Sequence, residues 1–354
     1  MTKDSLIAST FTPTAPVLGQ LDVLGRVPVP LRRSFAAGMD RAALAYRAAH
    51  GFTLQRCLLH GAEWYRPFDG LAHASDGSAL PSMLITTLQQ DVLLPDLLAH
   101  YRPDPVCPIE PPPPAAIVRA AELLDPEAVF QVFAFVPFVL LVDETRLRGR
   151  PAPRTWADLL DPMWAGEVVF GGFRAHDAAP YTEFNSFLLE CVQHEFGDEG
   201  LVALAHNVKH LQHNVRTATL AGSNSSRVGA IAVLPYMQAQ LCPRRDRTRV
   251  VWPEDGALAM PIAYLVQPEA AERMQPVIDY LTGDELADVF GRNGYPATGP
   301  GSLHAKLADD ARLKWPGWDY FRARDMLERT RAAAETFFQA WYGRGDAARS
   351  GTCG

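Results

Sequence analysis

Hydrophobic residues fall into two kinds of pattern along the chain: stretches with helical spacing and short continuous runs. Phe35, Met39 and Tyr46 recur at helical spacing across residues 33–50, which predicts an amphipathic helix that ends at Gly51. Similar patterns predict helices at 92–101, 115–124, 156–160, 185–196, 199–215, 275–281, 284–292 and 322–342. The continuous runs predict strands at 52–59, 81–86, 129–142, 167–170, 229–234, 250–252 and 258–266.

Strands and helices alternate along most of the chain, which favours an α/β fold with a mainly parallel sheet. The alternation begins again after Asp143, so we expect two α/β domains. The first is discontinuous, at 27–131 and 259–300, and the second covers 143–257. Residues 1–26 are polar, contain prolines and show no periodicity, which predicts a loose N-terminal arm.

The last part of the chain, 301–354, is expected to be a helical extension. Trp315, Trp318, Tyr320 and Phe321 stand just ahead of the predicted final helix. Leaving four large aromatic side chains in water is unfavourable, at roughly 25 cal/mol per Å² of apolar surface. We therefore expect this extension to pack on the first domain.

Composition excludes several functions. Hydrophobic residues make up 48% of the chain and charged residues 21%, as in an average globular protein. The net charge of −7 gives no general attraction for nucleic acid. The longest apolar stretch, 129–142, contains Gln131 and Pro137 and is shorter than the roughly 20 residues of a membrane helix. We expect neither nucleic-acid binding nor membrane insertion.

Common catalytic and cofactor motifs are missing from the sequence. It contains no GxGxxG, GxxxxGK[ST], HExxH or GxSxG, so we expect no cofactor. The best candidate for a nucleophile with a base is Cys191 with His194 three residues later, although the leucines around them predict a packed helix. An enzyme remains an alternative on this pair.

Three histidines are weak candidates for a metal site. His206, His210 and His213 fall at helical spacing within the predicted helix 199–215, opposite its apolar stripe. Three imidazoles on one exposed face could bind a transition metal, as in an intracellular metal-binding protein or metal chaperone. An unpaired polar face has the same pattern.

Three polar segments could contact a ligand. Gly171–Gly172 follows a predicted strand and the serine-rich segment 222–226 precedes one, and exposed amides in such turns can bind an anion. Glu254 and Asp255 place two carboxylates on a tight turn between two strands, where they could accept hydrogen bonds or bind a hard metal ion. Ordinary solvated turns have the same composition.

Five longer stretches carry a further signal. They are 138–143 (FVLLVD), 153–170 (PRTWADLLDPMWAGEVVF), 229–236 (GAIAVLPY), 252–266 (WPEDGALAMPIAYLV) and 276–283 (PVIDYLTG). Their order and spacing resemble the bacterial ABC-transporter solute-binding proteins, the group that contains ferric-iron and polyamine binders, from about residue 27 to 300. The resemblance implies a type II periplasmic-binding-protein-like fold, in which two α/β domains enclose a central cleft and are joined by crossover strands, here 132–142 and 258–266, that act as a hinge.

The resemblance also implies a function: a monomer without catalytic activity captures a small solute in the cleft for an ABC permease. In the ferric-iron branch two adjacent tyrosines of the second domain grip the metal, whereas here 234–237 is Leu-Pro-Tyr-Met and only Tyr236 matches. Thr86 and Thr87 stand in the region where that branch has a carboxylate. The solute therefore stays open between a metal ion or complex, an oxyanion and a small organic molecule.

Location is open at this stage. No apolar run of about seven residues precedes Pro13, so no secretory signal is visible and the cytoplasm is favoured. The family role would place the protein in the periplasm.

In this fold the ends of strands and the starts of helices face the cleft, and free amides at helix starts favour anions. The ligand-binding candidates chosen by this rule are Arg33, Ser34, Thr86, Thr87, Gly171, Gly172, Tyr181, Asn185, Tyr236, Glu254 and Asp255. The resemblance selects Tyr236 as well.

Overall fold

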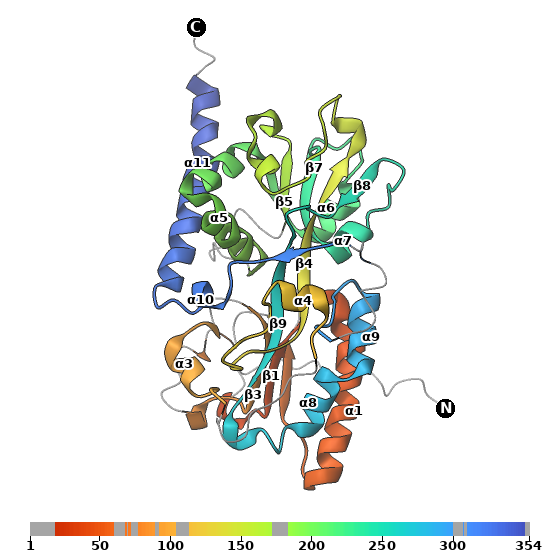
Figure 1. Cartoon of the computed structure of the whole chain (residues 1–354), viewed down its shortest axis with the longest axis vertical. Helices are drawn as coiled ribbons and strands as arrows, with labels where there is room; N and C mark the ends of the chain where they lie inside the picture. The colour runs from red at the N-terminus through yellow and green to blue at the C-terminus, as the bar shows by residue number, and fades with distance from the viewer. Residues whose placement is uncertain are drawn as a thin grey trace, which may run out of the picture.

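One sheet joins the two lobes of the molecule (Figure 1). Within the described residues it has ten strands, in the order β2-β1-β3-β9-β4-β7-β5-β6, with β8 paired to β4 and β10 paired to β9. The computed structural model describes residues 18–59, 68, 70, 71, 77–88, 92–103, 113–171, 183–299, 307 and 310–350, with the backbone alone for 170–171, 183–185 and 344–350. The α/β fold predicted from the sequence is confirmed.

Lobe one, at the bottom of Figure 1, holds the parallel strands and the helices beside them. Its strands are β1 (Val23–Arg26), β2 (Arg56–Leu59) and β3 (Met83–Thr87). Its helices are α1 (Arg32–His50), α3 (Pro95–Ala99), α4 (Ala116–Ala120), α8 (Gln275–Thr282) and α9 (Asp284–Arg292). The predicted first helix is confirmed, and it ends at Gly51, whose φ of 79° is left-handed.

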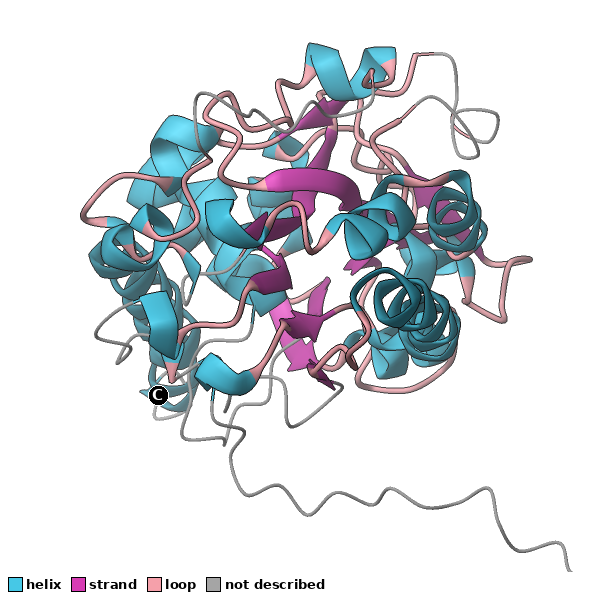
Figure 2. Ribbon diagram, turned by 90° about the horizontal axis from the view of Figure 1, so that it is seen from below, coloured by secondary structure: helices cyan, strands magenta, loops and turns pink. Residues whose placement is uncertain are grey.

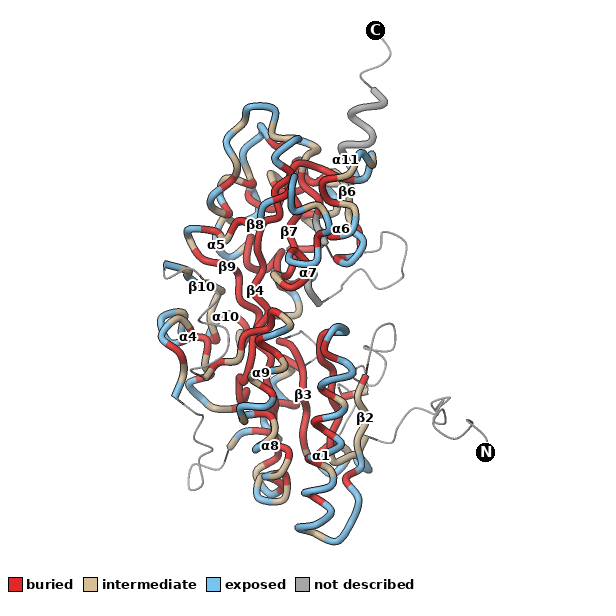
Figure 3. The backbone as a smooth tube through the Cα atoms, turned by 90° about the vertical axis from the view of Figure 1, so that its right-hand side faces the viewer, coloured by how far each residue is buried: buried red, intermediate tan, exposed pale blue. Residues whose placement is uncertain are grey.

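Lobe two contains a second set of parallel strands. Its strands are β5 (Val168–Gly171), β6 (Val208–Gln212), β7 (Ile231–Pro235) and β8 (Thr248–Val251). Its helices are α5 (Glu183–Asn207), α6 (Asn214–Leu220) and α7 (Tyr236–Gln240). Helices flank the strands on either side in Figure 2, and the buried residues follow the strands through both lobes in Figure 3.

Two long strands connect the lobes. β4 (Gln131–Asp143) and β9 (Ala257–Val266) run antiparallel, with register from Gln131 opposite Tyr264 to Phe138 opposite Leu258. Every residue of both strands is buried. Their continuous apolar sequence is therefore explained by burial on both faces, as expected for central strands.

The prediction of a loose arm at 1–26 is wrong where the structure describes it. Residues 23–26 form β1, which pairs with both β2 and β3, and Val23 and Leu24 are fully buried. Four residues are too few to show periodicity, and the pairing partners are distant in sequence. Residues 1–17 lie outside the described part.

The predicted helix 199–215 is wrong beyond residue 207. α5 ends at Asn207, the next five residues form β6 beside β5, and His213 caps the start of α6. The apolar residues of this stretch fit a helix and a short buried strand equally well, and pairing with β5 decides for the strand. α5 itself is broken at Gly197, whose φ is 65°.

The C-terminal segment packs on the first domain only in part. Helix α11 (Met326–Ser350) lies along α5 of lobe two, as Figure 1 shows, although docking on the first domain was expected. The short β10 (Leu313–Lys314) and α10 (Trp318–Phe321) precede it. Trp318 stacks on Phe130 at 5.2 Å between ring centroids, and its Nε1 donates to Leu123 O at 3.3 Å. Trp318 of the aromatic segment thus contacts residues 123–130 of the first domain, whereas Phe321 stacks on Phe187 of α5 and α11 covers the same helix.

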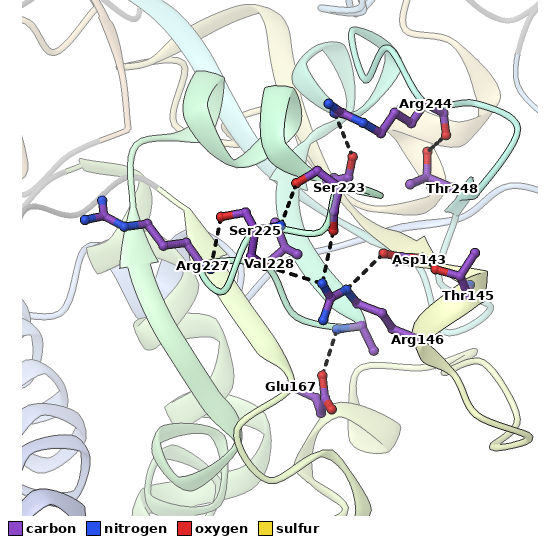
Figure 4. Close-up of polar contacts among 12 residues, drawn as sticks. Asp143, Thr145, Arg146, Glu167, Ser223, Ser225, Arg227, Val228, Arg244 and Thr248 are labelled. Carbon is purple, nitrogen blue, oxygen red and sulfur yellow. Dashed lines mark hydrogen bonds and ion pairs between the residues drawn. The ribbon is translucent and has the colours of Figure 1, made fainter.

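An arginine fixes the far end of lobe two (Figure 4). Arg146 donates to the carbonyl oxygens of Ser223 (3.0 Å) and Ser225 (3.4 Å) and pairs with Asp143 at 3.3 Å. Glu167 accepts the amide of Ala230 at 3.2 Å. These contacts hold the loop that leads into β7, at the end of the strand farthest from lobe one.

Candidate functional site

The two lobes point the carboxyl ends of their strands toward each other. β3 is antiparallel to β9 and ends at Thr87, opposite Ile262. β7 is antiparallel to β4 and ends at Pro235, opposite Phe138, which also pairs with Leu258. From Leu258 to Ile262 is four steps of β9, about 13 Å at roughly 3.3 Å per residue. We call these facing strand ends, of β1–β3 in lobe one and β5–β7 in lobe two, the interlobe edge.

The interlobe edge is the candidate site because ligands of open α/β sheets bind beyond the carboxyl ends of strands. In lobe one, β1 and β2 run parallel to β3 and therefore end on the same side. In lobe two, β5 and β6 run parallel to β7. Six strand ends and the helices after them thus converge on one region.

Arg26 brings a positive charge to the lobe-one side of this edge. It is the last residue of β1, is 1% exposed, and donates from Nε to Thr86 Oγ1 at 2.7 Å. The Thr86 hydroxyl donates onward to Thr87 O at 2.8 Å. The guanidinium carbon lies 3.9 Å from the centre of the Phe68 ring, a cation–π contact. Thr86 and Thr87 are both fully buried, and Thr86 orients Arg26.

Arg33 and Ser34 lie in the first turn of α1, which follows β1 and the 3-10 turn Val29–Leu31. Both side chains are exposed. The structure therefore places Arg33 and Ser34 after a strand end of lobe one, as the strand-end rule expects. Their side chains are not held there by contacts with buried residues that the structure describes.

Two buried amide side chains stand at the lobe-two side of the interlobe edge. Gln212 is the last residue of β6 and pairs in register with Gly171, the last residue of β5. Asn214 follows at the start of α6. Gln212 is 8% exposed and Asn214 5%, yet among the described residues Gln212 Nε2 and Asn214 Oδ1 have no hydrogen-bond partner. One unpaired donor and one unpaired acceptor are therefore left two residues apart.

Two more buried polar atoms, on the helices after the strand ends, have no partner in the part of the chain that the structure describes. They are Gln238 Oε1 on α7 and Ser186 Oγ in the first turn of α5. A buried polar group without a partner costs about 1–3 kcal/mol, so such groups mark places where water or a ligand supplies the missing bond. All four unpartnered atoms belong to segments that begin or end at lobe two's strand ends.

Tyr236 follows the end of β7, where the strand-end rule places it. It is half-buried, and its ring packs edge-on against Trp252, with 5.6 Å between centroids. Burial raises the pKa of its phenol, and a hydrogen bond with Gln240 opposes that shift. The phenol is thus neutral near pH 7 and directed at its own helix and Trp252, unlike a phenolate prepared for a metal.

The two acids of the β8–β9 turn have structural partners. Glu254 forms an ion pair with Arg154, and its amide donates to Arg154 O at 2.8 Å. Asp255 pairs with Lys314 at 2.7 Å and accepts weakly from the Trp156 amide at 3.3 Å. The turn lies across β4 from β7, because β8 and β9 pair with the opposite side of β4. These carboxylates hold residues 154–156 and β10, which accounts for them without a ligand.

Several other candidates cannot be assigned to the interlobe edge. Gly172 and Tyr181 lie outside the described residues, and only the backbone of Asn185 is described. The serine-rich segment 222–226 lies at the far end of lobe two. There its carbonyls accept from Arg146, and its hydroxyls accept backbone amides within the turn (Figure 4).

The proposed histidine face is not formed. His206 lies on α5, His210 on β6 and His213 at the cap of α6, so the three do not share a helix. His210 approaches Ser226 O at 3.3 Å, and burial lowers its pKa. Among the residues the structure describes, no group of three His, Cys, Asp or Glu side chains could hold a metal ion.

Cys191 is in the wrong environment for a nucleophile. It is 3% exposed on α5, and burial raises the pKa of its thiol well above the ordinary value. The ring of His194 packs against Tyr320 with 4.8 Å between centroids. A thiol nucleophile needs a lowered pKa, so this pair does not form a catalytic dyad.

Sequence reasoning missed Arg26, Gln212, Asn214, Ser186 and Gln238. Arg26 was assigned to the arm, and Gln212 and Asn214 to the interior of a helix that the structure breaks. Only the strand assignment of β1 and β6 places Arg26, Gln212 and Asn214 at strand ends, and that assignment depends on pairing with β3 and β5.

Comparison with known proteins agrees with this geometry. Residues 83–324 match the profile of a family described as bacterial extracellular solute-binding protein. A comparison with curated proteins found no match. Among the helices of the described residues, none combines the length and apolar character needed to cross a bilayer.

Three solved structures with similar folds are distant in sequence. The apo ferric ion-binding protein A of Pasteurella haemolytica has a TM-score of 0.60 at 11% identity, with 90% of this chain and 96% of that chain covered. The Trichodesmium protein IdiA (FutA), in complex with iron and citrate, gives 0.58 at 11%, with 90% and 98% covered. The periplasmic binding protein AfuA of Actinobacillus pleuropneumoniae, with fructose-6-phosphate bound, gives 0.56 at 11%, with 88% and 96% covered.

Proposed function

Because the chain belongs to the bacterial extracellular solute-binding protein family, we propose that its interlobe edge captures a small polar solute for an ABC-type uptake system. The observation that carries the proposal is the pair of buried, unpartnered amides of Gln212 and Asn214 at the end of lobe two's sheet. A solute that presents one acceptor and one donor would satisfy both groups. Two hydrogen bonds gained in this way favour the bound state.

The connection between the lobes suits capture by closure. Between the ends of β3 and β7 the lobes are joined through β4 and β9, at residues 135–137 and 259–261. Bending of such crossover strands lets two lobes open and close around a ligand. Closure would bring the Arg26 side of the interlobe edge toward Gln212 and Asn214.

The charges at the edge favour a polar organic solute or an oxyanion over a bare ferric ion. Hard cations prefer anionic oxygen ligands. Among the described side chains, the lobe-two side has neutral amides and a neutral phenol that packs on Trp252, and the lobe-one side has the cation Arg26, which donates to Thr86 and lies over Phe68. Of the structures named above, one is of a ferric ion-binding protein, one contains iron with citrate, and one contains a sugar phosphate. The last two show that similar folds hold polar anions.

We further propose that the protein has no catalytic activity of its own. The buried thiol of Cys191, with its raised pKa, supports this, as does the packing of His194 on Tyr320. The reactive form of a thiol is the thiolate, which burial disfavours here. Alkylation by iodoacetamide should leave Cys191 unmodified in the native protein, and rapid native-state modification would contradict the proposal.

Native mass spectrometry and thermal unfolding test the solute-binding proposal together. The untagged protein is sprayed under native conditions to detect a co-purified solute, then unfolded with a panel of sugars, sugar phosphates, amino acids, oxyanions, ferric citrate and ferric chloride. A specific solute at a hundredfold excess over its Kd should add about 2.7 kcal/mol to the free energy of unfolding. Ferric chloride should add nothing. The proposal would be contradicted if ferric chloride were the only compound that stabilises the protein. It would also be contradicted if no compound stabilised the protein and no solute co-purified with it.

A further inference from the structure

A cavity lies within lobe one, apart from the interlobe edge. Its volume is about 1080 Å³. It is bounded by the start of β4, the end of β9, and helices α8 and α9. None of Arg26, Thr86, Gln212, Asn214 and Tyr236 lines it. Its size is at the upper end of ordinary small-molecule pockets, which hold roughly 300–1,000 Å³.

The inner wall of this cavity is mostly apolar. The buried Gln131 and Thr298 also line it, but they donate to Ala128 O at 2.7 Å and to Val132 O at 3.0 Å. Its apolar side chains come from the two crossover strands and from α8 and α9: Val132, Phe133, Tyr264, Val266, Ile278, Leu281 and Leu286. All are buried, and Phe133 and Tyr264 stack with 6.4 Å between ring centroids. This wall would bind the apolar part of a ligand.

The rim of the cavity is negatively charged. Glu269, Glu272 and Asp284 line it and are exposed, and no lysine or arginine is among its described lining residues. Within the part of the chain that the structure describes, none of these three carboxylates has an ion pair. Charges of one sign beside a low-dielectric wall raise the local concentration of oppositely charged ligands.

Nearby arginines are occupied elsewhere, which is why the rim stays negative. Arg273 follows Glu272 directly, but its guanidinium pairs with Asp22 and donates to Tyr46 Oη and Ser82 Oγ, both at 2.7 Å. Arg102 pairs with Glu127 at 2.8 Å. Their charges are thus compensated by other acids.

We propose that this cavity is a second ligand site that binds an organic amine with an apolar body. The ammonium group lies beside Glu269 and Glu272, Asp284 adds negative charge at the other end of α8, and the apolar body packs on the wall of Phe133, Tyr264 and Leu281. The site is separate from the solute site and does not depend on its identity. Occupation would stiffen the junction between α8, α9 and the crossover strands.

Three probes of equal size separate charge from apolar contact: 4-phenylbutylamine, 4-phenylbutanol and 4-phenylbutyrate. Isothermal titration calorimetry on the intact protein at low salt should give a Kd for the amine at least tenfold below that for the alcohol, and no binding of the acid. Raising the salt concentration should weaken binding of the amine and leave binding of the alcohol unchanged. Equal affinity for the amine and the alcohol, or no binding of the amine at millimolar concentration, would overturn the proposal.

A matched set of variants locates the site. The double variant Glu269→Gln, Glu272→Gln should raise the Kd of the amine about tenfold and leave the alcohol unaffected. The control is Glu285→Gln. Glu285 is next to Asp284 in the sequence, but it pairs with Arg41 and does not line the cavity. Both glutamates of the double variant are exposed, so their removal should not impair folding. An unchanged Kd in the double variant, or an equal loss in the control, would place the amine elsewhere and overturn the assignment.

Discussion

Buried polar groups differ between two parts of lobe two. Where α10 and α11 pack on this lobe, the buried Glu190 of α5 contacts the hydroxyl of Thr330, Tyr320 Oη of α10 donates to Glu190 O at 3.5 Å, and Trp341 Nε1 of α11 donates to Val208 O of β6 at 3.0 Å. At the interlobe edge, Gln212 Nε2 and Asn214 Oδ1 are also buried but have no partner among the residues that the structure describes.

The difference separates a scaffold from a site. Polar groups inside a fixed interface are paired, because an unpaired one would cost about 1–3 kcal/mol at all times. A binding site can leave groups unpaired when the ligand supplies the partner. The completeness of hydrogen bonding therefore distinguishes the α5–α11 interface, which supports the lobe, from the strand ends that we propose bind the solute.

The largest effect is expected where the scaffold packs its aromatic residues. Trp318→Ala should lower the free energy of unfolding by about 3–5 kcal/mol, because Trp318 is 5% exposed and contacts Phe130 and Trp315. Tyr342→Ala is the control, since Tyr342 lies on α11 and is 54% exposed, and it should cost less than about 1 kcal/mol. Urea unfolding measures both. Equal losses would show that the C-terminal segment is not docked through its aromatic residues.

The second effect concerns the protonation of Glu190. Burial raises its pKa to about 8 from 4.5, although the contact with Thr330 opposes the shift. The Thr330 hydroxyl also donates to Met326 O at 3.0 Å, and it has one proton, so a protonated Glu190 can donate to Thr330. The folded state holds this proton more tightly than the unfolded state. The proton's contribution to the free energy of unfolding is therefore complete below pH 4.5 and is lost as the pH rises through 8.

Glu190→Gln isolates this effect. The variant keeps the shape of the side chain and cannot ionise, so its stability relative to the natural protein should increase between pH 5 and pH 9, by on the order of 3 kcal/mol. Urea unfolding at pH 5, 7 and 9 gives this difference. A difference that does not change with pH would mean that Glu190 is not a neutral acid in the folded protein.

A smaller effect is expected where a turn of lobe one touches lobe two beside the interlobe edge. Gly294 has a φ of 72°, and a Cβ there would lie 3.1 Å from Met237 Cα on α7. Gly294→Ala should lower the free energy of unfolding by about 2 kcal/mol and displace the lobes slightly. Gly149→Ala is the matched control, since its φ is 83° and a Cβ there would meet nothing within 4 Å. Urea unfolding and small-angle scattering compare them, and identical results for the two variants would exclude an effect of the interlobe contact.

Much of the fold could be predicted from the sequence because its central elements leave strong local patterns. The runs that became β4 and β9 are long, apolar and bounded by polar residues, and α1 has regular helical spacing up to Gly51. β1 and β6 could not be predicted in this way. Each has four or five residues, and each is a strand because a partner distant in sequence pairs with it.

The candidate site was predictable only in its location. The strand-end rule places Thr87, Gly171 and Tyr236 at strand ends, because β3, β5 and β7 were recognised. It could not show that Tyr236 packs on Trp252 or that Asp255 pairs with Lys314, since these partners are set by tertiary packing. Gln212 and Asn214 were missed because a helix was predicted across them.

The most direct test of the central claim measures Gln212→Met in two states, with Gln193→Met as the control. Gln193 is on α5, paired with Asp198 and remote from the strand ends. For Gln212→Met, removal of an unpartnered buried donor should leave the ligand-free protein as stable as before or more stable by about 1 kcal/mol, and should weaken binding of the identified solute at least tenfold. The control should change neither quantity. A clear loss of stability without ligand, together with unchanged affinity, would show that Gln212 is a structural residue and would contradict the placement of the solute site at the interlobe edge.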